Sequence, residues 1–96
     1  MPAVARYGDL CVTHCSPPTC EQVSDNVFIN DLGAHREGDL NSSHLLPCPS
    51  VCCTHSAPLE KGSDTVYVNG KQLGRIGDPY SGCTAVAEGS PDVFCG

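Results

Sequence analysis

The sequence is short of the large side chains with which a small domain usually builds its core. Its 96 residues include two phenylalanines, three tyrosines, one methionine and no tryptophan. We interpret residues 1–96 as a single domain, and a domain of this size buries too little apolar surface to be stable by a wide margin. We therefore expect a metal ion or disulfide bonds to supply part of the stability.

Basic residues are scarce as well, and this bears on the partners that the protein can bind. Lysine and arginine number five against eleven aspartates and glutamates, which gives a formal net charge of −6. Because nucleic-acid binding needs clustered lysine and arginine to neutralise phosphates, we expect no nucleic-acid partner. Arg6, Arg36 and Arg75 each begin an Arg-x-Gly-Asp sequence, and we expect each to pair with an aspartate or a carbonyl at a strand end.

Long apolar segments and helical patterns are absent too. No apolar run approaches the roughly 18 residues that cross a membrane, and the start, Met-Pro-Ala-Val-Ala-Arg, lacks the pattern of a signal peptide. We therefore expect a soluble protein that is made in the cytoplasm. No stretch has a convincing 3.6-residue period, whereas 10 glycines and 8 prolines favour turns and loops, so the predicted fold class is all-β.

What the sequence has instead is a repeated strand-turn-strand pattern, clearest in Gly62–Asp78. Residues 65–69 alternate in polarity like a half-buried strand, and Asn69-Gly70 is typical of a type I′ turn, after which 71–76 forms the return strand. Ser24–Asp39 follows the same pattern position by position. Gly89–Gly96 is the first half of a third copy, whose second half stands at the other end of the chain as Arg6–Asp9. The sequence thus predicts an internal threefold repeat that is opened inside one copy.

The remaining segments are assigned from this repeat. In the first complete copy we expect a strand over 23–30 and a return strand over 32–38. His35 falls at the position of Gly74 in the next copy, and we interpret it as a packing or surface residue. Leu40–Glu60 is interpreted as a long connection between copies.

Three of the four histidines fall in the loops between copies. Under a pseudo-threefold axis these loops gather at one pole, and they contain His14 in the first, His44 and His55 in the second, and Cys83 in the third. Three imidazoles and one thiolate form a closed tetrahedral set for Zn²⁺. None of the three histidines lies in a predicted strand. The alternative is that they are ordinary surface residues.

Eight cysteines in 96 residues are typical of secreted domains with disulfide frameworks. Without a signal peptide, metal ligands and reduced thiols are favoured instead. A disulfide remains possible in an oxidising space, and the sequence leaves open the state of seven cysteines: Cys11, Cys15, Cys20, Cys48, Cys52, Cys53 and Cys95.

Taken together, these motifs resemble the PAAR-repeat family, the conical proteins that cap the spikes of contractile injection machines. The resemblance covers essentially the whole chain and is carried by Gly8-Asp9, His14, Ser24–Asp39, His44, His55, Gly62–Asp78, Cys83 and Gly89–Gly96. The Pro-Ala-Ala-Arg of the family's return strand is Gly33–Arg36 in one copy and Gln72–Arg75 in the other, with only the arginine retained in both.

This resemblance implies a small cone of short strands and hairpins, with an apex pinned by one structural zinc through His14, His44, His55 and Cys83. The base of the cone is expected to cap a trimeric β-helical spike protein, one copy per trimer, in a type VI secretion system or a contractile phage tail. The function is then mechanical and non-enzymatic. The protein is expected to be ejected with the spike or carried on the virion tail, touching the target membrane transiently, and docking of effectors remains open.

Two alternatives remain. If Cys83 is not a ligand, the three histidines leave an open zinc position, as in a small zinc-dependent hydrolase or lyase, with Glu60 or Asp39 as candidate general base. The other alternative is a secreted, disulfide-stapled interaction domain that acts as a toxin or an inhibitor. The adjacent Cys52 and Cys53 and the absent signal peptide count against it.

Overall fold

The fold is built from short antiparallel hairpins joined by turns and isolated backbone bridges. The structure, a computed structural model, describes residues 1–13, 16–47 and 52–96. It pairs β1 (Phe28–Ile29) with β2 (Leu32–Gly33), β3 (His44–Pro47) with β4 (Cys52–His55), and β5 (Tyr67–Val68) with β6 (Lys71–Gln72). No helix occurs in these described ranges, so none there is long and apolar enough to cross a membrane. The all-β prediction is confirmed.

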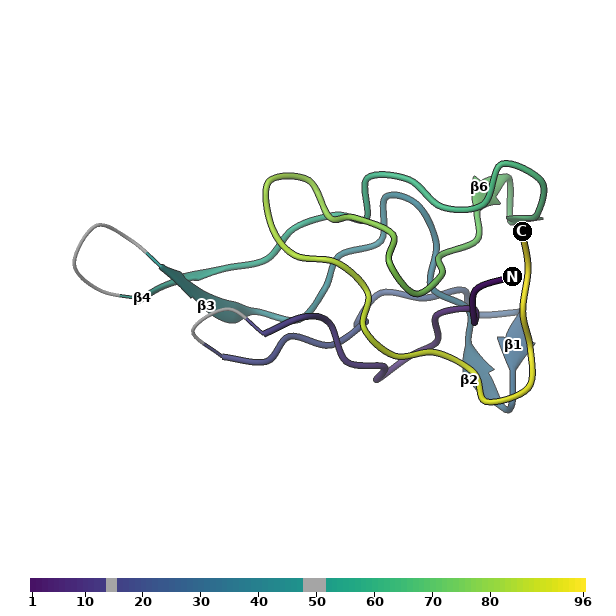
Figure 1. Ribbon diagram of the computed structural model, residues 1–96, viewed down its shortest axis with the longest axis horizontal. Coiled ribbons are helices and arrows are strands. Elements are labelled where there is room, and N and C mark those ends of the chain that lie inside the picture. Colours follow the sequence, from purple (N-terminus) through teal and green to yellow (C-terminus); the bar gives the residue numbers. More distant parts are fainter. Residues whose placement is uncertain (14–15, 48–51) are drawn as a thin grey trace.

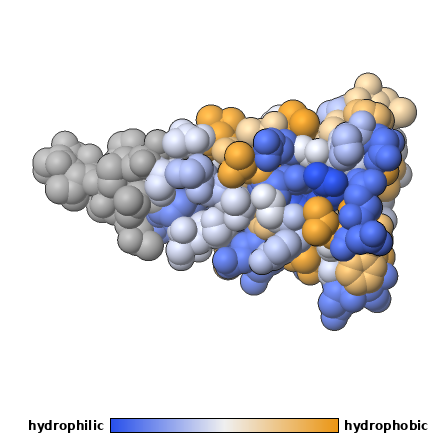
Figure 2. All heavy atoms as spheres, turned by 90° about the horizontal axis from the view of Figure 1, so that it is seen from below, coloured by the Kyte–Doolittle hydropathy of each residue, from blue (hydrophilic) through white to orange (hydrophobic). Residues whose placement is uncertain are grey.

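The molecule is elongated and tapers toward one end. Its principal extents are 40 × 24 × 21 Å. The β3–β4 hairpin projects from the narrow end, while β1, β2, β6 and both chain termini lie at the wide end (Figure 1). The space-filling view shows the same widening away from the hairpin (Figure 2). The two ends therefore present different parts of the sequence.

Both hairpin turns at the wide end have the backbone geometry of type I′. Asn30 and Asp31 have φ angles of 54° and 67°, and Asn69 and Gly70 have 55° and 76°. Positive φ at both central residues is the signature of this turn. The turn that the sequence predicts at Asn69-Gly70 is present, and Asn30-Asp31 adopts the same turn without a glycine.

The strands around these turns are shorter than predicted. Of 23–30 only Phe28–Ile29 is a strand, because the Ser24 hydroxyl accepts the backbone N–H of Val27 at 3.0 Å and turns the chain before the strand begins. Of 71–76 only Lys71–Gln72 is a strand. Beyond it the backbone changes partner, since Gly74 N–H donates to the carbonyl of His35 at 2.8 Å instead of to its own hairpin.

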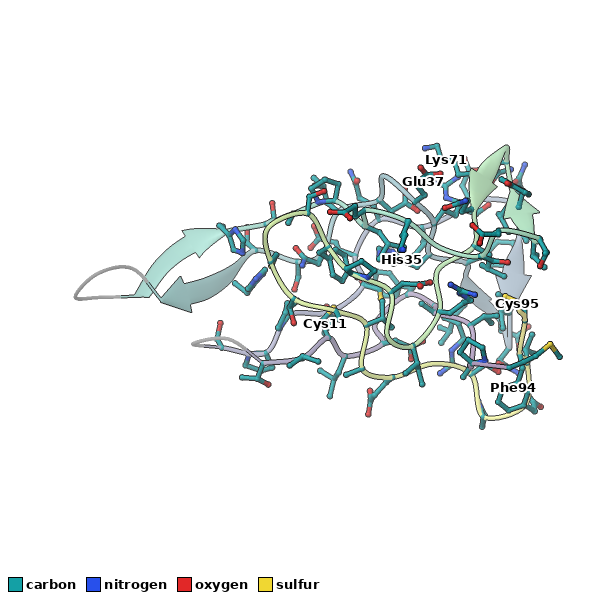
Figure 3. The ribbon with its side chains drawn as sticks, turned by 45° about the horizontal axis from the view of Figure 1, so that its top comes forward. Cys11, His35, Glu37, Lys71, Phe94 and Cys95 are labelled. Atoms are coloured by element: carbon teal, nitrogen blue, oxygen red, sulfur yellow. The ribbon has the colours of Figure 1, made fainter. Side chains whose placement is uncertain are left out.

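A closed ring of three backbone hydrogen bonds lies at the centre of the molecule. Ala5 N–H donates to Gly74 O at 2.8 Å, Gly74 N–H to His35 O at 2.8 Å, and His35 N–H to Ala5 O at 3.1 Å. All three residues are buried, and Figure 3 places the labelled His35 deep within the body. The ring ties together segments from the start, the middle third and the last third of the chain.

Each of the three ring residues is followed by an Arg-x-Gly-Asp turn. In every turn the arginine side chain and the aspartate form an ion pair, and the glycine takes a left-handed φ of 84° to 92°. The predicted arginine–aspartate pairing is therefore confirmed in all three turns: Arg6–Asp9 at 3.0 Å, Arg36–Asp39 at 2.8 Å and Arg75–Asp78 at 2.9 Å.

Buried apolar side chains form two small clusters. One contains Val4, Ala34, Val68, Leu73 and Cys95, and the other contains Ala5, Cys11, Cys20, Ala57, Leu59, Tyr80 and Val86. Cys95 of the first cluster lies near the wide end, and Cys11 of the second lies nearer the β3–β4 hairpin (Figure 3). His35 is completely buried, so of the two interpretations of this residue packing is correct and surface is wrong. With so few large side chains, the core depends on backbone and polar pairing as well as on apolar contact.

Candidate metal centre at the narrow end

Three of the four predicted zinc ligands lie together where the β3–β4 hairpin joins the body. Cys83 Sγ is 3.3 Å from His44 Nε2 and 3.0 Å from His55 Nε2. The two imidazole rings meet edge to face with centroids 4.5 Å apart. All three donor atoms lie within 4.8 Å of one another, so the cluster can hold a metal ion. The fourth predicted ligand, His14, lies outside the described residues.

The β3–β4 hairpin sets the position of the two histidines. His44 is the first residue of β3 and His55 is the last of β4, and the register pairs them directly opposite each other. Directly opposed residues in an antiparallel pair have side chains on the same face, about 5 Å apart at Cβ. The hairpin therefore delivers two imidazoles to one side of its base.

This arrangement corrects the sequence interpretation of 40–60 as a connection without strands. His44 and His55 do lie in strands, contrary to the prediction that none of the candidate ligands does. Prolines in the segment favoured a loop, because proline cannot donate a hydrogen bond to a strand ladder. Here Pro47 ends β3 and so stands at the margin of the ladder.

A tight turn brings Cys83 to the histidines. Tyr80 N–H donates to Thr84 O at 2.8 Å, Cys83 N–H to Tyr80 O at 3.3 Å, and Gly82 has a φ of 60°. An antiparallel bridge between Leu59 and Tyr80 fastens this turn beside the chain that leaves β4. The thiol thus comes from a segment distant in sequence but joined to the hairpin by backbone pairing.

The hydrogen bonding of His44 suits a metal ligand. Its Nδ1 lies 2.7 Å from the carbonyl oxygen of Ser42. A carbonyl only accepts, so in the neutral ring Nδ1 carries the hydrogen and Nε2, the atom that faces Cys83 Sγ, carries the lone pair. A backbone carbonyl that fixes the tautomer of a ligating imidazole in this way is a common feature of metal sites.

The spacing of the donors fits a small tetrahedral ion. With zinc–sulfur and zinc–nitrogen bonds of about 2.3 and 2.1 Å, sulfur and nitrogen at two corners of a tetrahedron are about 3.6 Å apart. The distances of 3.3 and 3.0 Å here need only a slight expansion to admit the ion. Two imidazoles and a thiolate are also donors that zinc accepts readily.

The surroundings bear on the alternative of a catalytic zinc. Asp39, one of the two candidate bases, is buried and has both carboxylate oxygens bonded to Arg36, at 2.8 and 3.0 Å. An aspartate held in this way serves the Arg-x-Gly-Asp turn. Glu60, the other candidate, is exposed.

One buried neighbour of the cluster, Asn41, was not predicted from the sequence. Its side-chain nitrogen lies 3.8 Å from Cys83 Sγ, and its side-chain oxygen accepts the N–H of Ala57 at 2.8 Å. The only sequence signal is its place three residues before His44.

Neither a protein-family model nor a curated protein matches this chain.

Proposed function

We propose that this protein is the tip of the membrane-piercing spike in a contractile injection machine, a type VI secretion system or a phage tail. Its wide end docks on a trimeric β-helical spike protein, and a structural zinc pins its narrow end. In this role it performs no catalysis, travels with the spike or the virion tail, and meets the target membrane only transiently. The resemblance to the PAAR-repeat family motivates the proposal, and three features of the fold support it.

The first feature is the recurrence of one unit around a common centre, as a pseudo-threefold repeat requires. The closed ring of Ala5, His35 and Gly74 and the three Arg-x-Gly-Asp turns support this interpretation. Contacts between neighbouring units recur as well, since one serine hydroxyl of each unit donates to the next: Ser24 to Asn69 Oδ1 at 2.7 Å, Ser90 to Asn30 Oδ1 at 2.6 Å, and Ser63 to the carbonyl of Gly96.

The second feature carries the proposal. Phe28, Tyr67 and Phe94 occupy the same position in the three units, and these residues are 59%, 56% and 48% exposed. They belong to the wide end, where Figure 1 shows β1 and Figure 3 labels Phe94. One chain thus offers three related aromatic anchors around one centre. A partner that binds them equivalently is itself threefold, and exposed aromatic residues are the usual anchors of protein interfaces.

The third feature is the His44–His55–Cys83 cluster at the opposite end. The ion would tie the hairpin to the Cys83 turn, and so stiffen the end that must carry a load. In a domain with little apolar core, the free energy of metal binding is also free energy of folding. A structural zinc site with four protein ligands has no open position, which agrees with a mechanical role.

The docking surface is tested by aspartate substitution. A candidate trimeric β-helical spike protein is immobilised, and binding of the wild type is compared with that of F28D, Y67D and F94D. Each variant should lose about tenfold or more in affinity, because a buried charge replaces an aromatic anchor. Val12→Asp is the matched control, since Val12 is 53% exposed but lies outside the aromatic set. Unchanged binding by the three aromatic variants would rule out this docking surface.

A further inference from the structure

Asn41 is a completely buried polar residue beside the candidate metal centre. It pairs with Cys20 in an isolated antiparallel bridge, and its backbone N–H donates to Ala57 O at 3.0 Å. It also precedes His44 by three residues and so lies on the segment that leads into β3. A buried amide is retained in a core only where its hydrogen-bonding groups are satisfied.

The orientation of this amide is fixed by its partners. Ala57 N–H can only donate, so the side-chain atom that it meets at 2.8 Å is the acceptor Oδ1. The NH₂ group must then point the other way, and there it lies 3.8 Å from Cys83 Sγ. A donor suits a thiolate, which only accepts, and hydrogen bonds to sulfur are longer than those to oxygen.

The residues at the corresponding positions of the other two units are not asparagines. Cys11 and Tyr80, like Asn41, stand two residues after the aspartate of an Arg-x-Gly-Asp turn. Their side chains bond to each other instead, with the Cys11 thiol 3.4 Å from the Tyr80 hydroxyl. The side-chain amide of Asn41 therefore lies beside Cys83, whereas the side chains of Cys11 and Tyr80 pair with each other.

We propose that Asn41 is a positioning residue for the metal centre, donating its Nδ2–H to the metal-bound thiolate of Cys83. The inference rests on the proposed metal role of the His44–His55–Cys83 cluster. The bond stabilises the negative charge of the thiolate, and the Ala57 contact holds the amide against the segment that follows β4. Loss of such a supporting partner typically lowers metal affinity by about 10- to 100-fold.

The wild-type protein provides the most direct test. It is loaded with ¹¹³Cd²⁺, a spin-active substitute for zinc, and the side-chain amide protons of Asn41 are observed by NMR. A hydrogen bond to the metal-bound sulfur should produce a scalar coupling between ¹¹³Cd and one of these protons. A resolved Asn41 amide without any coupling overturns the inference, even if the metal binds as proposed.

Variants provide the second test. Asn41→Asp keeps the oxygen that accepts from Ala57 but turns an acceptor toward the thiolate, and Asn41→Leu removes both contacts. Both should bind zinc about 10- to 100-fold more weakly in competition with a chromophoric chelator. In the Co²⁺ forms, the sulfur-to-cobalt charge-transfer band should move to longer wavelength, because a thiolate without its donor is easier to oxidise. A purely structural role of Asn41 would leave that band in place.

Cys11→Ala is the matched control. It alters the related core position without touching the Asn41–Cys83 contact, so the variant should keep wild-type zinc affinity and the wild-type cobalt spectrum. Wild-type affinity in both Asn41 variants contradicts the inference while leaving the metal centre intact. Failure of the wild type itself to bind zinc contradicts the proposed metal role, and the inference falls with it. If neither Asn41 variant folds, the ¹¹³Cd coupling decides.

Discussion

Tyr80 donates its hydroxyl hydrogen to Nε2 of His35 at 2.8 Å, joining two buried residues that lie 45 positions apart. The direction of the bond follows from the other ring nitrogen. Burial, the largest cause, lowers the pKa of His35 below the ordinary 6.5, which favours the neutral ring. His35 Nδ1 lies 2.6 Å from the carbonyl of Gln22 and must donate to it, so in the neutral ring Nε2 is the acceptor.

The first prediction is that acid destabilises the protein through His35. Because the pKa is lower in the folded state, the unfolded state binds more protons once the pH falls below about 6.5. The contribution of His35 to the free energy of unfolding is thus complete above that pH and declines as the pH falls toward the folded-state pKa. Urea unfolding of the chelated protein between about pH 7.5 and 5.5 should show this loss.

His35→Asn separates this effect from the titration of the other histidines, which both proteins share. Asparagine can still donate to Gln22 but does not titrate, so the variant should be less stable at neutral pH and less sensitive to acid. An NMR titration in which the His35 ring gains its proton above pH 6.5 would contradict the account.

The second prediction concerns the space at the central ring. A Cβ added to Gly74 would lie 2.9 Å from Leu59 Cδ2 and 3.0 Å from the carbonyl oxygen of His35. Gly74→Ala should therefore lower the free energy of unfolding by about 1–3 kcal/mol through overpacking. Denaturant unfolding measures the change, with the exposed Lys61→Ala as control. A variant as stable as the control would show that the ring can expand.

The third prediction concerns the turn at Asn69, whose φ is 55°. Asn69→Val should cost about 1–2 kcal/mol from backbone strain alone. The side chain also accepts hydrogen bonds from Ser24 Oγ at 2.7 Å and Arg36 Nη1 at 2.9 Å, so the total loss should be larger. Asn69→Gly loses the bonds without the strain, and the difference between the two variants in thermal melts isolates the strain. Equal melting temperatures of the Asn69→Val and Asn69→Gly variants would contradict the predicted contribution of backbone strain.

The fourth prediction is that zinc contributes to folding. For structural sites the binding free energy is on the order of 10 kcal/mol at neutral pH. His44→Ala should lower the melting temperature of the zinc-loaded protein by more than about ten degrees. After exhaustive chelation, wild type and variant should melt at similar temperatures, because both then lack the ion. If chelation leaves the melting temperature of the wild type unchanged, zinc does not contribute to the stability of the fold.

Short-range chemistry made part of this fold readable from the sequence. Asn69-Gly70 predicts its turn because few residues tolerate positive φ. The arginine and the aspartate of each Arg-x-Gly-Asp turn are only three residues apart, so their ion pair is also predictable from the sequence. The grouping of His44, His55 and Cys83 also agrees with the prediction from the sequence, which placed the loops between the proposed repeats at one pole.

The features that the sequence did not reveal depend on contacts between distant segments. The β3–β4 hairpin pairs His44 with His55 across a segment whose prolines and cysteines favour a loop. His35 is buried against Tyr80, which is distant from it in sequence. The proposed role of Asn41 depends on its contacts with Ala57 and Cys83, which are also distant in sequence. Strand lengths were overestimated because alternation of polarity does not show where the backbone changes partner.

The proposal that one chain and one zinc ion cap a threefold spike is tested most directly by native mass spectrometry of the purified complex with the trimeric spike protein. Under this proposal one chain already carries three exposed aromatic anchors, Phe28, Tyr67 and Phe94, so a second copy would find no equivalent surface on the trimer. The account predicts a single species of three spike chains, one copy of this protein and one zinc ion. Three copies bound to one trimer, or a complete assembly without metal, would contradict it.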